Sequence, residues 1–138
     1  MKESFEEPKP QFKWPDIEAE WGEFDRVAKR FEIDESVLMF QARNGELVDL
    51  DEDMWSNLEN TDSNRFLPGG LEAAHRFAAE VGRDSHNLLH KIEAGEALDA
   101  PIIMQIGDIY HLVAGNTRLM VARAKGVTPK VLLFSVDV

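Results

Sequence analysis

Two short apolar runs near the C-terminus limit the possible folds more than any other feature of this sequence. Residues 101–106 and 109–114 are rich in isoleucine and other strand-forming residues, and only Gly107 and Asp108 separate them. Two such runs around a two-residue turn that contains glycine predict a β-hairpin. After Arg118 the apolar residues return to a helical spacing. This part of the chain therefore predicts two strands, a tight turn and a helix.

Most of the remaining chain has the pattern of amphipathic helices. The expected helices cover residues 16–31, 34–44, 71–82 and 84–95, and short strands are expected at 47–50 and 130–134. The side chains expected to face the core from the first two helices include Trp21, Val37, Leu38 and Phe40. The expected fold class is α+β. The hairpin and a C-terminal strand, with a helix between them in the chain, would form a small mixed sheet packed with several helices and preceded by a helical N-terminal extension.

The charge of the chain is uneven. Residues 1–63 hold 7 Lys/Arg against 18 Asp/Glu, a net of −11, whereas residues 64–98 sum to −1 and residues 99–138 to +1. Within one compact domain, we expect three regions: a flexible or docked arm at 1–15, an acidic and mostly helical region at 16–63, and the folded core at 64–138. Because phosphate backbones bind cationic surfaces, non-specific nucleic-acid binding by the acidic half is not expected.

Several chemistries are excluded or not indicated by the composition. There are no cysteines, so disulfides, thiolate metal sites and a cysteine nucleophile are excluded. No stretch approaches the ~18 apolar residues of a membrane span, and the first residues are too acidic for a signal peptide. The four histidines have no metal-binding pattern. We expect a cytoplasmic protein that does not associate with membranes.

The residues Gly115, Asn116, Thr117 and Arg118 stand between the second strand and the next helix, where an anion is favoured. The first N–H groups of a helix lack partners within it and carry a partial positive charge. Gly115 would let an anion approach the backbone, and Arg118 would supply a charged fork that fits phosphate. Another interpretation remains open, in which Asn116 or Thr117 only caps the helix and Arg118 pairs with an N-terminal carboxylate.

The segment 102–134 resembles the ParB/sulfiredoxin superfamily. It carries the stretch Tyr-His-Leu-Val-Ala-Gly-Asn-Thr-Arg-Leu-Met-Val-Ala-Arg-Ala-Lys-Gly at 110–126, and the preceding helix and Pro-Ile entry extend the resemblance to about residues 84–134. In ParB-like domains the corresponding turn is Gly-Glu-Arg/His-Arg and contacts nucleotide phosphates. In sulfiredoxins it is Gly-Cys-His-Arg, and its cysteine is catalytic. Gly115 and Arg118 match both patterns.

Two positions of the turn depart from this pattern. Asn116 replaces the glutamate or cysteine, and Thr117 replaces the arginine or histidine. The missing cysteine excludes sulfiredoxin chemistry, and an amide cannot act as a base in nucleotide hydrolysis. The resemblance still implies a nucleotide- or phosphate-binding domain, and some relatives are nucleotide-dependent kinases of small molecules. The Asn-Thr-Arg variant also looks like small domains of bacteriophages. A phage-encoded protein of this kind would be expected in the host cytoplasm.

A second polar cluster and one strand histidine are further candidates for the site. Asp62 could serve as a metal ligand or base, and Thr61 and Ser63 could donate to a phosphate, if this cluster faces the turn at 115. The alternative is a polar loop that caps the next helix. His111 could polarise a phosphate, although a half-exposed position in the strand is the expected one.

Three functional hypotheses follow. The first is a nucleotide-binding domain, with phosphotransferase or nucleotidase activity and Mg²⁺ beside the nucleotide. The second is a non-enzymatic, acidic phage protein whose N-terminal helices bind a basic host protein or occupy a DNA-binding site. The helix at 16–31 could equally pair with its copy in a homodimer. The third is a nuclease that uses Asp62, which the acidic charge disfavours.

Overall fold

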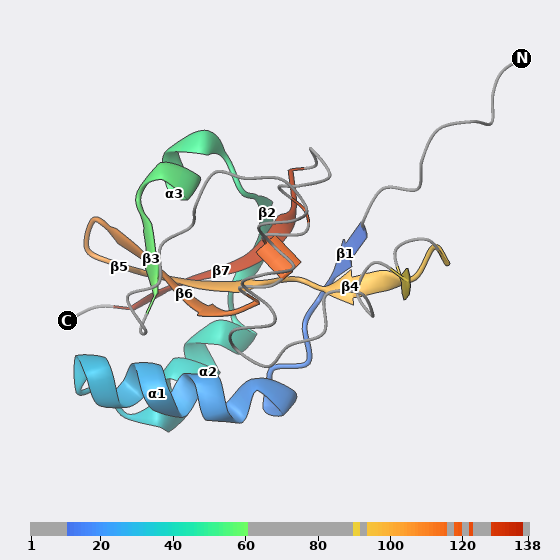
Figure 1. The fold of residues 1–138 in the computed structure, drawn as a ribbon. Helices are drawn as coiled ribbons and strands as arrows, with labels where there is room; N and C mark the ends of the chain where they lie inside the picture. The colour runs from blue at the N-terminus through green and yellow to red at the C-terminus, as the bar shows by residue number, and fades with distance from the viewer. Residues whose placement is uncertain are drawn as a thin grey trace, which may run out of the picture.

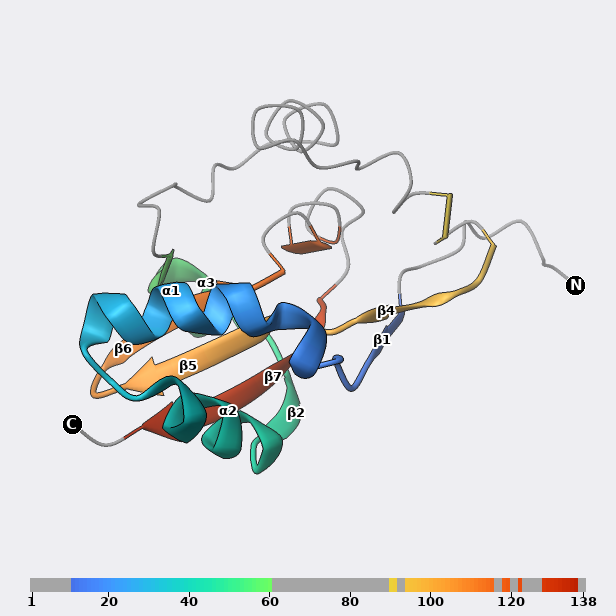
Figure 2. The same cartoon turned by 90° about the horizontal axis from the view of Figure 1, so that it is seen from below.

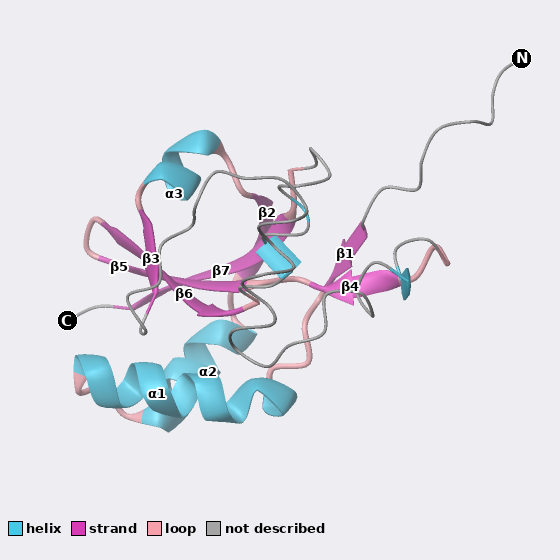
Figure 3. Ribbon diagram, in the orientation of Figure 1, coloured by secondary structure: helices cyan, strands magenta, loops and turns pink. Residues whose placement is uncertain are grey.

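A five-stranded mixed sheet with helices on both of its faces organises the fold (Figures 1 and 3). The structure is a computed structural model that describes residues 11–60, 90–91, 94–115, 118–119, 122 and 128–136. The strand order in the sheet is β2-β7-β5-β6-β3. The strands are β2 (Glu46–Asp49), β3 (Leu58–Asn60), β5 (Ile102–Ile106), β6 (Ile109–Ala114) and β7 (Lys130–Val136).

Strands β5 and β6 form the hairpin predicted from the sequence. They pair antiparallel, and Ile106 lies opposite Ile109 across the two-residue turn. Gly107 has a φ of +59°, which suits the first central position of a type II′ turn. Strand β7 pairs in parallel with β5, so the sheet is mixed. The predicted α+β class is therefore confirmed.

The N-terminal half supplies both edges of this sheet. Strand β2 pairs antiparallel with β7, and β3 pairs in parallel with β6. The region predicted at 16–63 is thus more than a helical extension, because two of its strands, β2 and β3, belong to the same sheet as the C-terminal hairpin. Pairings between segments so distant in the chain depend on a shared core, which a local sequence pattern does not reveal.

Helices α1 (Trp21–Phe31) and α2 (Glu35–Arg43) cover one face of the sheet (Figure 2), and a short 3-10 helix, η1 (Glu18–Glu20), leads into α1. Alternate strand residues point to this face. The fully buried side chains of its core include Phe24, Leu38, Ile102, Met104 and Leu132. The Phe24 ring lies 6.2 Å from the Phe134 ring, measured between centroids. This core attaches both helices to the central strands.

Helix α3 (Glu52–Ser56) lies over the opposite face (Figure 1). Asp51 caps it by accepting a hydrogen bond from the Met54 N–H at 2.9 Å. The smaller core on this side consists of Leu50, Met54, Ile103, Leu112, Leu119 and Val131. Leu119 belongs to the helical residues that follow β6, so this second core connects the predicted phosphate-binding turn to the sheet.

The face that α2 buries differs from the expectation. Leu38 is buried as predicted, but Val37 is 44% and Phe40 is 60% exposed. Met39 and Ala42 fill the core instead. Residues 37–40 are all apolar, so their spacing alone does not decide which of them face the sheet. The prediction for Val37 and Phe40 was therefore wrong.

Trp21 is also on the surface rather than in the core. It begins α1, is 54% exposed, and donates its indole N–H to Glu35 Oε1 at 2.7 Å. An indole combines a large apolar body with one donor, and this arrangement satisfies the donor across two helices. The predicted burial of Trp21 was wrong because residues 18–20 form a 3-10 helix and α1 begins only at Trp21, so one α-helical spacing does not extend from Ile17, which is buried, through Trp21.

Strands β1 (Gln11–Lys13) and β4 (Ala97–Asp99) form a separate two-stranded parallel sheet (Figure 2). Gln11, Phe12 and Lys13 pair in register with the three residues of β4. Pro15, which follows, is buried. The described part of the expected arm is therefore docked on the rest of the chain.

Asp34 caps α2, and its carboxylate makes helix stability depend on pH. It accepts hydrogen bonds from the Ser36 hydroxyl at 2.6 Å and from the Ser36 N–H at 2.8 Å. The hydroxyl first, and then the N–H, hold the pKa of Asp34 below its ordinary value. Because the folded-state pKa is depressed, the stabilisation is present at neutral pH and is lost as the pH falls through that pKa.

We expect Ser36→Ala to raise the pKa of Asp34, because it removes the hydroxyl donor and leaves the backbone donor. NMR titration of the Asp34 carboxyl carbon measures this change. Ser135→Ala, which removes an exposed serine hydroxyl from β7, is the matched control and should leave the titration unchanged. An Asp34 titration that is the same in Ser36→Ala and the wild type would contradict the assignment.

Two predicted helices fall largely outside the part of the chain that the structure describes. These are the helix at 71–82 and most of the helix at 84–95, of which the structure describes the helical residues His90 and Lys91 and the turn residues Ala94 and Gly95. Among the described helices, none has the length and apolar character needed to cross a membrane.

Candidate functional site

The turn after β6 is built around Gly115. Its φ of +102° lies in the left-handed region that favours glycine. A Cβ at this position would stand 2.7 Å from Pro101 Cα and 3.2 Å from Arg118 Nη2. The Leu119 N–H donates to the Gly115 carbonyl at 2.9 Å, the spacing of an α-helical hydrogen bond, and Arg118 and Leu119 are helical. The packing against Pro101 explains why this position holds glycine.

Arg118 lies beside this turn, and its side chain is only 15% exposed. Its Nη1 donates to the Asp99 carbonyl at 2.8 Å, and its Nη2 donates to Glu20 Oε2 at 2.8 Å. The Glu20 side chain is 23% exposed, so the ion pair is largely withdrawn from water. The interpretation in which Arg118 pairs with an N-terminal carboxylate is confirmed. These contacts use two of the five N–H donors of the guanidinium.

Asp99 connects the N-terminal segment to the same place. Its carboxylate accepts the Asp16 N–H at 3.1 Å and lies 3.7 Å from Lys13 Nζ. The Lys13 carbonyl accepts the Ala100 N–H at 2.9 Å. We call the group formed by Glu20, Asp99, Gly115 and Arg118 the Gly115 corner. It joins the N-terminal segment, β4 and the turn after β6.

No local sequence signal identifies Glu20 or Asp99 as members of this corner. Glu20 is separated from Arg118 by 98 positions in the chain. It is one of 18 acidic residues in the first 63. Only the fold selects it, by placing the end of η1 against the turn that follows β6.

The other predicted site residues lie outside the described part of the structure. They are Asn116, Thr117, Thr61, Asp62 and Ser63. Within the described residues, no three His, Asp or Glu side chains are grouped so that they could hold a metal ion. The structure thus brings Gly115 and Arg118 together, and the proximity of residues 61–63 to this corner stays a prediction.

His111 is fully buried, which corrects the expected half-exposed position. It points to the face covered by α1, and its ring meets the Phe31 ring edge-on at 4.9 Å between centroids. The register places His111 opposite Met104, a member of the same core. In the described structure His111 therefore packs between the sheet and α1.

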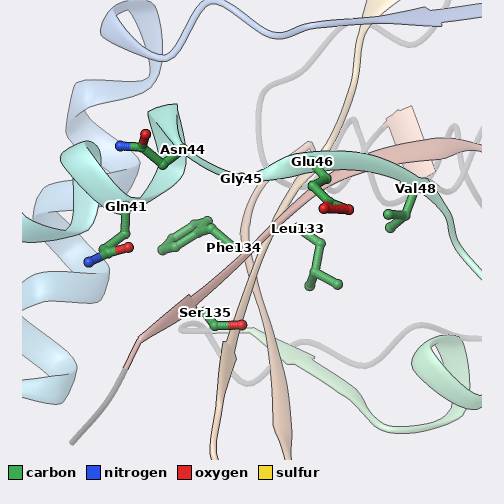
Figure 4. A pocket seen from close by; sticks show the side chains of 8 residues that line it. All are labelled: Gln41, Asn44, Gly45, Glu46, Val48, Leu133, Phe134 and Ser135. Atoms are coloured by element: carbon green, nitrogen blue, oxygen red, sulfur yellow. The ribbon is translucent and has the colours of Figure 1, made fainter.

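A pocket of ≈ 380 Å³ opens at a different place, where α2 meets β2 and β7 (Figure 4). Gln41 lines it from α2, Asn44 lines it from the C-cap of that helix, and Ser135 lines it from β7. None of the residues of the Gly115 corner lines this pocket. The pocket and the predicted phosphate-binding position are thus two separate features of the surface.

Comparison of the chain with protein-family models, curated proteins and solved structures gave no match. The resemblance of residues 84–134 to ParB/sulfiredoxin domains therefore stays a prediction from the sequence.

Proposed function

We propose that the Gly115 corner binds the phosphate group of a small ligand, and that this ligand is a nucleotide. One observation carries the proposal. The largely buried guanidinium of Arg118 already holds a carboxylate oxygen of Glu20, next to the start of a helical turn. A position that stabilises one oxyanion has the charge and the donors to stabilise another. The ParB-like pattern at Gly115 and Arg118 supports a nucleotide.

Glu20 must compete with such a ligand. A phosphate would have to replace the Glu20 carboxylate or share the guanidinium with it, and two anions on one cation repel each other. A phosphate carries more negative charge than a carboxylate and can bind arginine through two parallel hydrogen bonds. The bond from Arg118 to the Asp99 carbonyl would keep the guanidinium oriented while Glu20 is displaced.

Phosphotransferase or nucleotidase activity would need a base or metal ligand near the phosphate. Asp62 is the candidate for that role, with Thr61 and Ser63 as further phosphate donors and Mg²⁺ bound together with the nucleotide. Binding does not depend on this catalytic part, because the guanidinium of Arg118 could hold a phosphate whether or not Asp62 acts on it.

The test is a screen of inorganic phosphate and of ATP, CTP and GTP with Mg²⁺, by calorimetry and thermal shift. We expect at least one of them to bind, and Arg118→Lys to weaken that binding by about tenfold. Lysine keeps the charge but lacks the planar fork. Arg43→Lys is the matched control, because Arg43 pairs with Glu18 on the surface of the helical layer.

Two results would remove the proposal. One is the absence of binding by all four ligands. The other is equal affinity of the wild type and Arg118→Lys for the ligand that binds, which would locate the ligand elsewhere on the protein.

A further inference from the structure

Strand β7 is longer than its neighbour β2, so part of its edge is left open. β2 pairs with β7 only from Lys130 to Leu133, whereas β5 pairs with it as far as Val136 on the other side. At Gly45 the chain leaves the sheet and joins α2. Among the described strands, none pairs with β7 beyond Leu133 on the β2 side.

The backbone of Ser135 points toward this open edge. The Leu132 N–H donates to the Pro101 carbonyl at 2.8 Å, so Leu132 directs its backbone groups to the β5 side. Backbone groups alternate along a strand, and Leu133 and Ser135 therefore face the β2 side. The Leu133 carbonyl lies 2.6 Å from the position that a Gly45 Cβ would take, which agrees with this direction. Ser135 thus offers an N–H and a carbonyl where β2 has ended.

The pocket of ≈ 380 Å³ is located at this open edge (Figure 4). Ser135 lines it from the strand, and Gln41 and Asn44 line it from the end of α2. The same side of α2 carries the exposed Val37 and Phe40, because residues 37, 40, 41 and 44 share one helical face. The exposed apolar residues of α2 therefore lie beside a polar pocket and beside strand backbone with which no described strand pairs.

The charge at this place indicates what it would bind. Glu46 lines the pocket, is exposed, and is not ion-paired with any described residue. Asp49, the other acidic residue of β2, is paired with Lys130 at 2.9 Å. Residues 11–60 hold 5 Lys/Arg against 14 Asp/Glu, so a second copy of the chain would bring like charges together.

We propose that an extended, basic segment of another protein binds here by adding a strand to the open edge of β7. Its backbone pairs with Ser135, a Lys or Arg side chain reaches Glu46, and its apolar side chains cover Phe40 and Val37. Strand addition draws affinity from main-chain hydrogen bonds and specificity from pockets for alternate side chains. This surface is independent of the Gly115 corner.

The probe is a short synthetic peptide in which valine and lysine alternate, compared with the same peptide carrying glutamate in place of lysine. We expect the lysine peptide to bind with an affinity that falls as salt is added. It should also slow amide hydrogen exchange at Ser135. The Phe134 N–H faces β5 and is the internal reference, because it is protected with or without the peptide.

Three variants separate this proposal from non-specific attraction. Ser135→Pro removes the donor at the open edge without touching the β5 ladder, and should abolish binding. Glu46→Lys should lower the affinity for the lysine peptide about tenfold and raise the affinity for the glutamate peptide. Phe40→Ser should weaken binding, whereas Ile109→Ser, at an exposed apolar residue of β6 outside this surface, should not.

Several outcomes would overturn the proposal. Binding that is unchanged in Glu46→Lys and Phe40→Ser would show that the peptide does not use this surface, even if Ser135→Pro fails to fold. A dimer that forms through Phe40 in sedimentation experiments would make a second copy the occupant. Inorganic phosphate that perturbs the Ser135 and Glu46 amides would make the pocket a small-anion site.

Discussion

Gly115→Ala is expected to lower the free energy of unfolding by about 3 kcal/mol, as measured by urea denaturation followed by circular dichroism. Two costs add at this position. A left-handed φ costs an alanine about 1–2 kcal/mol. The new Cβ would also stand 2.7 Å and 2.8 Å from the Cα and Cβ of Pro101, and such overpacking costs about 1–3 kcal/mol. Pro101 cannot move away easily, because its carbonyl accepts a hydrogen bond from β7.

Gly107→Ala is the matched control. Gly107 also has a positive φ, but nothing lies within 4 Å of the position that its Cβ would take. The backbone cost alone, about 1 kcal/mol, should remain. Equal losses in the two variants would show that the contact with Pro101 is relieved at little cost, and that the close packing of the Gly115 corner does not contribute to stability.

The hairpin and the start of α2 could be predicted because their causes are local. Gly107-Asp108 between two strand-forming runs selects the turn, and the turn fixes the pairing of β5 with β6. Asp34 stands three residues before the apolar run 37–40 and caps α2 by accepting the Ser36 N–H. Such signals require no knowledge of the rest of the chain.

The buried face of α2 and the edges of the sheet could not be predicted because their causes are distant. Four consecutive apolar residues, 37–40, leave the phase of the helix open, and the sheet beneath α2 decides it. The pairing of β3 with β6 joins segments about fifty residues apart, for which only the finished core provides a reason. Phe40 is exposed because the sheet buries the other face of α2, which carries Leu38, Met39 and Ala42.

The candidate site was predicted in part. The strand, the glycine turn and the helical residues after it were read correctly from the spacing, and so was the possibility that Arg118 pairs with an N-terminal carboxylate. The identity of that carboxylate could not be read, because acidic residues are frequent in the first half of the chain. The same ion pair now supplies a way to separate the structural role of Arg118 from its proposed role in binding.

Arg118→Ala is expected to lower the free energy of unfolding by about 2–3 kcal/mol. It removes two hydrogen bonds from a largely buried guanidinium, one of them to a carboxylate that would stay behind without its cation. Glu20→Gln keeps an acceptor oxygen for Arg118 and loses only the charge, so we expect it to lower the free energy of unfolding by about 1 kcal/mol. The two variants and their combination form a double-mutant cycle, and we expect a coupling energy of about 1 kcal/mol.

The same variants act in opposite directions on ligand binding if the Gly115 corner holds a phosphate. Glu20→Gln removes the competing anion. If this lowers the free-energy cost of displacing residue 20 by about 1 kcal/mol, phosphate or nucleotide binding should become about fivefold tighter. Arg118→Ala would abolish that binding. Glu18→Gln is the matched control, because Glu18 lies in the same short helix but pairs with Arg43.

Stability and binding therefore give independent answers. A coupling energy near 1 kcal/mol, together with a higher ligand affinity in Glu20→Gln, means that Arg118 exchanges the Glu20 carboxylate for the phosphate. The same coupling energy with no change in ligand affinity means that Arg118 serves only to join the N-terminal segment to β4 and the turn after β6. In that case the glycine and the arginine of the turn are explained by packing against Pro101 and pairing with Glu20, and the phosphate proposal fails while the fold is unaffected.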